Sequence, residues 1–437
     1  MTAITSVKAH RVWDSRGNPT VEVQVALASG AYGRAIAPAG ASRGTREAID
    51  LRDGGPFLRG LDVQKALQSV QTRIAPAIVG LDAEHQSVID AAILSCDPSP
   101  LKANLGGNAT VATSLAVLHA AAADAGTPLW QHIAALTGQK PALPLPEIQI
   151  FGGGAHAGRQ IDVQDFLIMV PGATSFDEVM EVTSAVYFAA GNILKRSGKL
   201  AGVADEGGWW PQFTSNEQAL ETLMAAIVLA GETPGDRVVL SLDIAASEFG
   251  KNGRYQLALE DRALQTSGMI DMLGRWLNDY PIVSIEDPLA EDDTIGMIEF
   301  TRRFGDRVQI IGDDYLVTNA TLIDQAALDR ACNAVLIKVN QAGTVTEALA
   351  AFAAAQRAGF GAVVSARSGE SEDVSISHLA TGLGCGQLKV GSFARSERMA
   401  KWNECLRIQD MLGSGRFVAG APLARTWWGR QAAPKPV

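Results

Sequence analysis

Cysteine is scarce in this sequence. The 437 residues include four cysteines, Cys96, Cys332, Cys385 and Cys405, and none of them forms a CxxC pair. A disulfide framework or a zinc knuckle therefore has little support, because both depend on paired or closely spaced cysteines. We interpret the four side chains as reduced thiols that are mostly buried.

Long apolar runs are also missing. The segment Met1–Gly17 contains no apolar stretch of signal-peptide length. The apolar stretch Met224–Gly231 is far too short to cross a bilayer. We therefore expect a cytoplasmic protein with no membrane partner.

Positive charge is in deficit. Lys and Arg number 37 against 47 Asp and Glu, which gives a formal net charge of −10. This balance disfavours a general surface for nucleic acid or for an anionic membrane. The protein can still bind a small anion, but only where it concentrates cations locally.

The chain is long enough for a large core and more than one domain. Hydrophobic residues make up 47% and charged residues 19%, as in ordinary globular proteins. The alternation in Val21–Val25 predicts a half-buried strand, and the Ala-rich stretch Thr110–Ala123 predicts a helix. Prolines punctuate residues 141–146, so we predict two domains, 1–138 and 139–437.

A repeated pattern follows that boundary. Short apolar runs rich in β-forming residues each end in a polar residue, and most precede a helix-like segment. The runs are 238–243, 282–286, 308–313, 334–338, 362–367 and 387–389. Several βα units in series favour a β/α (TIM-type) barrel with right-handed crossovers. A doubly wound sheet is the alternative, although no GxGxxG loop opens a helix here.

The polar residues that end these runs predict a shared site. In a β/α barrel the C-terminal ends of the strands converge on one mouth. Any one of them could be a helix cap or a solvated turn, but the repeated position weakens that interpretation. The six residues are Asp243, Glu286, Asp313, Lys338, Arg367 and Lys389.

The three acids among them predict a magnesium site. Carboxylates from three strands are hard oxygen ligands of the kind that Mg²⁺ prefers. Neither His nor Cys accompanies them, as a zinc site would require. The alternative is three separate salt bridges to the three basic residues, but crowded acids without a cation repel one another.

The basic residues predict proton abstraction and anion binding. Lys338 and Lys389 would be neighbours, and a second cation favours a neutral amine that can act as a base. Proton removal beside a carboxylate creates a second negative charge, which a divalent metal stabilises. Arg367 and Ser368 suit a phosphate or phosphonate. A core ion pair is the alternative for Arg367.

A second polar cluster lies earlier in the chain. His156 is set within the glycine-rich stretch Gly152–Gly158, and Asp165 and Asp205–Gly208 follow it. The glycines permit a ligand to approach the backbone closely. Glu206 could act as general acid for a leaving group if burial raises its pKa. Spacing alone does not assign that role.

Long motifs in order along nearly the whole chain resemble those of the enolase family. The matching segments are Asp14–Val23, Gly40–Ser42, Asp205–Gly208, Leu242–Phe249, Ser284–Pro288, Gly312–Asp314, Lys338–Gln341 and Arg395–Arg398. The resemblance implies a small α+β N-terminal domain, a modified β/α barrel, and a homodimer or higher homo-oligomer.

The resemblance also implies roles for individual residues. Lys338 matches the base, Lys389 the lysine that contacts the substrate carboxylate, and Glu206 the acid that assists departure of the hydroxyl. Enolase-superfamily sites pair such a base with magnesium, so the implied cofactor is Mg²⁺. The implied metal ligands are Asp243, Glu286 and Asp313, with Ser42 of the lid loop on a second metal. The implied substrate contacts are His156, Gln164, Asp165, Arg367 and Ser368.

The chain departs from the family pattern at several positions. Ala366 replaces an active-site histidine, and Asp165 replaces a glutamate. Arg43 stands in the lid loop where threonine is usual, and it could hold a further anionic group of the substrate. The stretch Gly152–His156 replaces Asn-Gly-Gly-Ser-His, and Trp209-Trp210 replaces Phe-Ala. These changes lie around the leaving group and the lid.

Three hypotheses follow from these motifs. The first is reversible dehydration of 2-phosphoglycerate to phosphoenolpyruvate, which the overall match favours. The second is a specialised paralogue of phosphonate metabolism, similar to carboxyphosphonoenolpyruvate synthase, which Ala366 and Arg43 favour. The third is a non-catalytic binding protein, which would predict loss of the acids or the lysines. In each enzymatic case the partner is a small anionic phosphorylated or phosphonate carboxylate, not nucleic acid.

Overall fold

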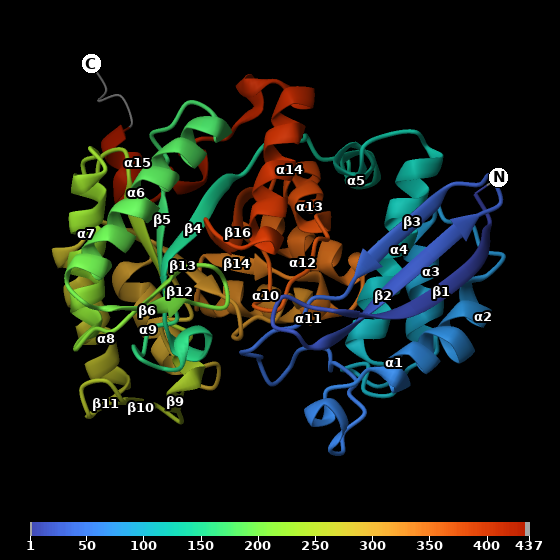
Figure 1. The fold of residues 1–437 in the computed structure, drawn as a ribbon, viewed down its shortest axis with the longest axis horizontal. Helices are drawn as coiled ribbons and strands as arrows, with labels where there is room; N and C mark the ends of the chain where they lie inside the picture. Colours follow the sequence, from blue (N-terminus) through green and yellow to red (C-terminus); the bar gives the residue numbers. More distant parts are fainter. Residues whose placement is uncertain (1, 433–437) are drawn as a thin grey trace.

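The N-terminal part of the chain is a small α+β unit. In the computed structural model, which describes residues 2–432, strands β1 (Ile4–Trp13), β2 (Pro19–Leu27) and β3 (Tyr32–Ile36) form an antiparallel meander. Helix α4 (Gly107–Asp124) covers this sheet (Figure 1). A Cβ at Gly33 would lie 2.1 Å from the Ala116 carbonyl oxygen, so the close approach of α4 to β3 requires glycine.

The remaining helices of this unit are short. They are α1 (Gln64–Ser69), α2 (Ala75–Ile78), α3 (Gln86–Ser95) and α5 (Leu129–Thr137), with a π-helical turn at Val70–Ile74. An irregular segment, residues 37–56, runs from β3 toward the rest of the molecule and contains the predicted lid loop. Its Ala39 exchanges backbone hydrogen bonds of 2.9 and 2.8 Å with Gly369, so the lid loop is joined to the second unit.

The second unit is a closed barrel of eight strands, as predicted. The strands lie in the order β4, β5, β8, β12, β13, β14, β15, β16, and β16 pairs with β4 to close the ring. Their bounds are β4 Leu145–Gly152, β5 Asp165–Met169, β8 Val239–Asp243, β12 Ile282–Glu286, β13 Gln309–Gly312, β14 Ala334–Ile337, β15 Gly361–Ser365 and β16 Gly386–Ser392. All neighbours run parallel except β5, which is antiparallel to both β4 and β8.

Helices surround this barrel (Figure 1). They are α6 (Phe176–Arg196), α7 (Asn216–Leu229), α8 (Thr266–Asp279), α9 (Thr294–Phe304), α10 (Ala320–Asp329), α12 (Val345–Ala358), α13 (Ser375–Leu383) and α14 (Ser396–Leu412). Local chemistry fixes where several of them begin, as where Ser175 accepts a 3.1 Å hydrogen bond from the Glu178 amide. None of the helices in residues 2–432 is both long and apolar enough to span a bilayer.

Shorter elements decorate the connections. A hairpin of β6 (Leu200–Val203) and β7 (Trp209–Pro211) follows α6, and a single helical turn, α11 (Val339–Ala342), follows β14. The strands β9 (Gly250–Lys251), β10 (Arg254–Leu257) and β11 (Arg262–Gln265) form a small separate sheet between β8 and α8.

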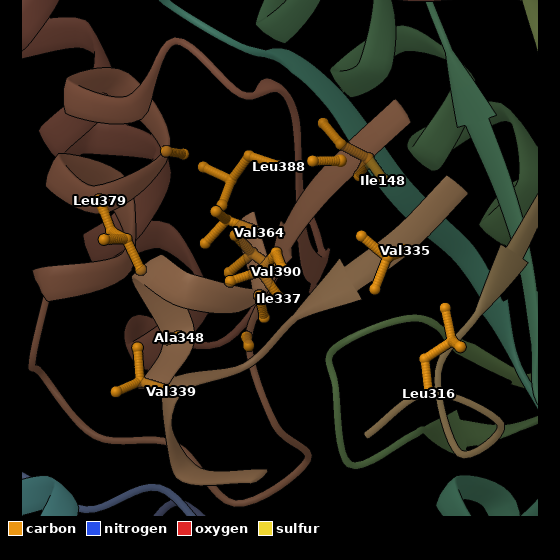
Figure 2. Close-up of a cluster of buried hydrophobic side chains, with 14 of the residues drawn as sticks. Ile148, Leu316, Val335, Ile337, Val339, Ala348, Val364, Leu379, Leu388 and Val390 are labelled. Atoms are coloured by element: carbon orange, nitrogen blue, oxygen red, sulfur yellow. The ribbon is translucent and has the colours of Figure 1, made fainter. Parts of the chain in front are cut away.

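Both faces of the barrel strands are buried, and apolar residues predominate in strands such as β14 and β15. Val335 and Ile337 of β14 contribute to the large cluster beneath the helices, where Val364 and Leu388 also lie (Figure 2). The intervening Leu336 belongs to a separate cluster with Ile311, Ala334 and Val363. Burial of each such side chain contributes about 1.5–3 kcal/mol before the entropy of ordering is counted.

A later segment covers one end of the barrel. Leu423 packs on Leu145, Met169, Val239 and Val283, which lie at the end of the barrel opposite the predicted mouth. Helix α15 (Trp427–Ala432) adds Trp427, whose indole N–H donates to the Ile282 carbonyl at 2.7 Å. This closure is therefore part of the barrel core.

Buried polar contacts join the two units. Asp90 on α3 accepts hydrogen bonds from the Thr346 amide at 2.9 Å and from the Thr346 hydroxyl at 2.6 Å, on barrel helix α12. Helix α5 packs on α13. Helix α5 ends at Thr137 and β4 begins at Leu145, and the boundary at 138/139 stays a prediction.

Candidate active site

The strand ends bring the predicted residues together at the barrel mouth. Asp165, Asp243 and Glu286 are register partners across β5, β8 and β12, and Lys389 pairs with Ser365 across β16 and β15. A catalytic pocket lies above them. Of the predicted residues, those that line it are Ser42, His156, Gln164, Asp165, Glu206, Asp243, Lys338, Arg367, Ser368 and Lys389.

Three predicted residues lie outside the lining of this pocket. Glu286 and Asp313 lie directly behind it, in contact with Lys389 and Lys338 respectively. Arg43 is exposed and lines a neighbouring groove instead. The pocket has an open volume of about 20 Å³, which is room for about one water molecule. A larger ligand therefore requires the lid loop or the lysine side chains to move.

Lys389 lies at the centre of the acid cluster. Its Nζ is 2.7 Å from Asp243 Oδ2, 2.7 Å from Glu286 Oε2 and 3.6 Å from Asp165 Oδ2. Burial lowers the pKa of Lys389, but the carboxylates, led by Asp243, outweigh burial and raise it well above its ordinary value. The ammonium group thus offsets part of the crowded negative charge.

Lys338 makes a second ion pair. Its Nζ donates to Asp313 Oδ2 at 2.6 Å, and the Gln341 amide donates to the other carboxylate oxygen at 2.8 Å. Burial lowers the pKa of Lys338, but Asp313 outweighs burial and raises it. The neighbouring cations Arg367 and Lys389 lower the pKa of Lys338, as expected, but Asp313 outweighs them in this ion-pair network.

The donor set fits a magnesium ion. Asp243, Glu286 and Asp313 offer hard oxygens, and within residues 2–432 the buried Glu286 Oε1 has no hydrogen-bond partner. Burial first, and then Asp243, raise the pKa of Glu286 well above its ordinary value. An additional cation among these carboxylates would relieve the repulsion that this shift expresses.

A further carboxylate lies beside this set. Asp287, Asp313 and Asp314 offer oxygens within 4.8 Å of one another. Both oxygens of Asp287 are already bonded, since they accept the amides of Asp313 and Asp314 at 2.9 and 2.7 Å. Burial, followed by the charge of Asp313, raises the pKa of Asp287 to about 8. We therefore interpret Asp287 as a residue that positions the turn carrying Asp313.

His156 joins two carboxylates on the other side of the pocket. Its Nδ1 is 3.4 Å from Asp165 Oδ1, and its Nε2 is 3.7 Å from Glu206 Oε1. Burial lowers the pKa of His156, but Glu206 and Asp165 outweigh burial and raise it to about 9. An imidazolium donates from both nitrogens, so this ring orients the two carboxylates instead of ligating a metal.

The lid loop closes onto Arg367. The Arg367 Nη1 donates to Glu47 Oε2 at 2.7 Å, and Nη2 donates to the Ser42 carbonyl at 2.9 Å. A Cβ at Gly40 would lie 1.9 Å from Arg367 Nη2, so this approach requires glycine. The Ser368 hydroxyl accepts the Ala41 amide at 2.6 Å. The predicted anion-binding pair thus lies against the predicted lid.

Sequence reasoning missed several supporting residues. Glu47 and Gln341 hold Arg367 and Asp313, and neither was singled out. The fully buried Arg398 donates to the carbonyls of Arg367 at 2.6 Å and Ser368 at 2.5 Å. Gln341 and Arg398 lie in motifs noted above, but nothing in a motif says which contact its side chain makes.

Comparison with known protein families agrees with this geometry. The model described as "Enolase, N-terminal domain" matches residues 4–133, and "Enolase, C-terminal TIM barrel domain" matches residues 140–426. The chain belongs to the enolase family. The match supports a lyase-type enzyme fold of the kind that is generally magnesium-dependent, and the acidic groups around Asp313 at the barrel mouth could hold a metal ion.

The departures from the usual enolase residues differ in where they lie. Ala366 is buried beside the pocket, and its amide donates to the Lys389 carbonyl at 2.9 Å. Trp209 stacks on Tyr187 with ring centroids 4.6 Å apart. The Tyr187 hydroxyl in turn donates to the Gly207 carbonyl at 2.9 Å, so Trp209 contacts the Glu206 loop through Tyr187. Trp210 does reach the lid side, since a Cβ at Gly158 would lie 2.8 Å from its ring.

Proposed function

We propose that this enolase-family chain is a magnesium-dependent lyase that removes the proton α to a carboxylate. The substrate is 2-phosphoglycerate or a close analogue, and the product is phosphoenolpyruvate or its analogue. The observation that carries the proposal is that Lys338 and Lys389, which line one pocket, make ion pairs with three buried carboxylates in or directly behind its wall. A structural ion-pair network alone needs no such pocket at a barrel mouth.

The pocket residues divide the reaction between them. Arg367 and Ser368 bind the phosphate, and Lys389 binds the carboxylate. Lys338 takes the proton from the α carbon, which it can do only when Asp313 is otherwise neutralised, because Asp313 raises its pKa. Asp243, Glu286 and Asp313 would hold the metal, which when bound would supply positive charge beside the substrate carboxylate.

Glu206 completes the elimination. It donates a proton to the departing hydroxyl as the carbon–oxygen bond breaks and the double bond forms, so water leaves. His156, 3.7 Å from Glu206, orients the carboxyl group. The net change is loss of one proton and one hydroxide from the substrate.

Deuterium exchange tests the first half of this reaction separately from the second. In D₂O with Mg²⁺, we expect 2-phosphoglycerate to exchange its α proton and to yield phosphoenolpyruvate, followed by ultraviolet absorbance. Absence of both exchange and product would contradict this proposal.

A second function is favoured by Ala366 and Arg43. It is a paralogue of phosphonate metabolism that resembles carboxyphosphonoenolpyruvate synthase. In that case α-proton exchange proceeds, but phosphoenolpyruvate does not accumulate from 2-phosphoglycerate. Ala366→His would then restore elimination if the missing imidazole is the cause. A non-catalytic role has less support, because the acids and lysines are all present.

We also propose that the protein works in the cytoplasm as a homodimer or higher homo-oligomer, with Mg²⁺ and a small anionic substrate as its partners. Sedimentation velocity at micromolar concentration measures the assembly directly, and a monomer would contradict it.

A further inference from the structure

A groove rich in arginine lies beside the catalytic pocket. It encloses about 570 Å³, and Arg16, Arg43, Arg52 and Arg159 line it, with Asp50 as the acid in its lining. The whole protein carries a net charge of −10. Four cations around one cavity are therefore a local reversal of the overall charge, and we call this cavity the arginine groove.

Two of these arginines, Arg16 and Arg52, already have partners. Arg16 Nη2 donates to the Ala39 carbonyl at 3.0 Å, and its Nε lies 3.9 Å from Asp14 Oδ2. Arg52 donates through Nη1 to the carbonyls of Pro19 and Leu61 at 2.6 and 2.9 Å, and its Nη2 lies 3.4 Å from Asp50. These contacts hold the wall of the groove together. Arg52 is therefore a structural cation that also contributes charge.

The other arginines keep donors available. Arg159 is 63% exposed and pairs with Glu248 at 2.8 Å, a surface ion pair that costs little to exchange. Within residues 2–432, Arg43 makes no side-chain hydrogen bond or ion pair. Burial lowers the pKa of Arg16, and the nearby Arg367 and Arg52 lower it further although Asp14 and Asp205 oppose them.

The groove and the catalytic pocket share a wall. Gly40 lines both of them. The loop that carries His156 into the pocket also presents Ala155, Gly158 and Arg159 to the groove. Since His156 lies against Glu206, the groove opens on the side of the pocket where Glu206 would protonate a leaving group.

We propose that the arginine groove binds a phosphate or phosphonate dianion carried on the carbon that bears the leaving group. The substrate class is then a three-carbon acid with a second such anion beyond the one at Arg367 and Ser368. The assignment of this second anion to the carbon that bears the leaving group rests on the proposed function, whereas the binding of an anion in the groove does not. Arginine suits the task because its planar fork can bind phosphate oxygens in pairs.

Calorimetric titration with two matched probes tests the proposal. The probes are 2-phosphoglycerate, which has one phosphate, and 2,3-bisphosphoglycerate, which has a second phosphate on the neighbouring carbon. With Mg²⁺ present, we expect the wild-type protein to bind the bisphosphate about 10-fold more tightly or more, since a tenfold ratio is about 1.4 kcal/mol and one charge-assisted contact contributes at least about that much.

Variants identify the source of that preference. In the double variant Arg43→Gln, Arg159→Gln we expect the ratio of the two affinities to fall below about threefold, since most of the charge-assisted contact is gone. Arg302→Gln is the matched control, because Arg302 also forms an exposed ion pair, with Glu299 at 2.7 Å, on α9. The control should keep the full ratio.

Three outcomes overturn the proposal: no preference in the wild type, a preference that survives in the double variant, or an equal weakening of both probes. Failure of the proposed function looks different. In that case α-proton exchange is absent, while the arginine-dependent preference for the bisphosphate remains.

Discussion

Arg367 of the barrel and Glu47 of the lid segment form a buried ion pair, with Arg367 Nη1 2.7 Å from Glu47 Oε2 and Nη2 3.3 Å from Oε1. Both side chains are at most 4% exposed. The pair joins β15's C-terminal end to the N-terminal unit. The guanidinium proposed to bind phosphate is therefore held in place by a carboxylate from the other domain.

Removing the charge of Arg367 should affect binding and stability separately. We expect Arg367→Gln to weaken 2-phosphoglycerate binding by about 100-fold, since a charge-assisted contact of about 3 kcal/mol is lost. It should also lower the melting temperature, because Glu47 is left as an unpaired buried charge. Calorimetric titration and thermal unfolding measure the two effects.

The double variant Arg367→Gln, Glu47→Gln separates them. It should recover most of the lost melting temperature without recovering affinity. Recovery of affinity would show that the arginine is only a structural link between the domains.

The acid cluster should control metal affinity. We expect Glu286→Gln to weaken Mg²⁺ binding by about 100-fold, because one of three anionic ligands is lost. Titration of chelator-treated protein with Mg²⁺ measures this. Asp271→Asn is the control. Asp271 lies on α8 and forms an exposed ion pair with Arg303 of α9, so this variant removes one negative charge far from the acid cluster. Similar weakening in both variants would mean that net charge, not coordination, sets the affinity.

The two halves of the proposed reaction should respond to different residues. Lys338→Ala should lower α-proton exchange by about 10³-fold, within the usual range for a general base. Glu206→Gln should abolish elimination but leave exchange measurable, because it removes only the proton donor to the leaving group. Isotope exchange in D₂O and absorbance of the product give the two rates. Loss of exchange in Glu206→Gln to the same degree as in Lys338→Ala would contradict this division of roles.

His156 should make stability depend on pH in metal-free buffer. Its pKa is raised in the folded protein to about 9, so its protonated form is favoured by folding. The stabilisation is fully present below the unfolded pKa of about 6.5, and it is lost as the pH rises through the folded value. The full effect is about 3 kcal/mol.

We therefore expect the stability difference between wild type and His156→Gln to shrink between pH 6.5 and pH 9.5, as measured by calorimetry at several pH values. His132→Gln is the control, because burial lowers the pKa of His132. His132 therefore changes the pH dependence of stability only at pH values below about 6.5. The stability difference between wild type and His132→Gln should be constant from pH 6.5 to pH 9.5. A flat profile for His156→Gln would mean that the imidazole is neutral.

The repeating strand pattern was enough to predict the barrel, because the six strands that it marked all run parallel and end at the mouth. The spacing between Asp243 and Glu286 was wider than the others, and the small sheet of β9, β10 and β11 fills that interval. Strands β4 and β5 were not predicted. Their pairing is antiparallel, so no helix separates them and the βα period does not apply.

The same reversal explains why Asp165 could not be placed by the strand-end rule. It is the first residue of β5, yet it lies at the mouth because β5 runs the other way. Only the glycine-rich loop before it and the family resemblance pointed to it. The partners of the charged groups, such as Glu47 for Arg367, could not be predicted because they join segments about 320 residues apart.

The closure of β4 by β16 has a consequence for how the chain is made. Strand β4 begins at Leu145, about 240 residues before β16 begins at Gly386. At roughly 5–20 residues per second, the ribosome needs roughly 10–50 s to supply that partner. During this time one edge of β4 is unpaired, and Leu145 at its N-terminal end still lacks its contact with Leu423. Closure of the ring therefore has to wait until translation is nearly complete, because β16 is the last strand to be made.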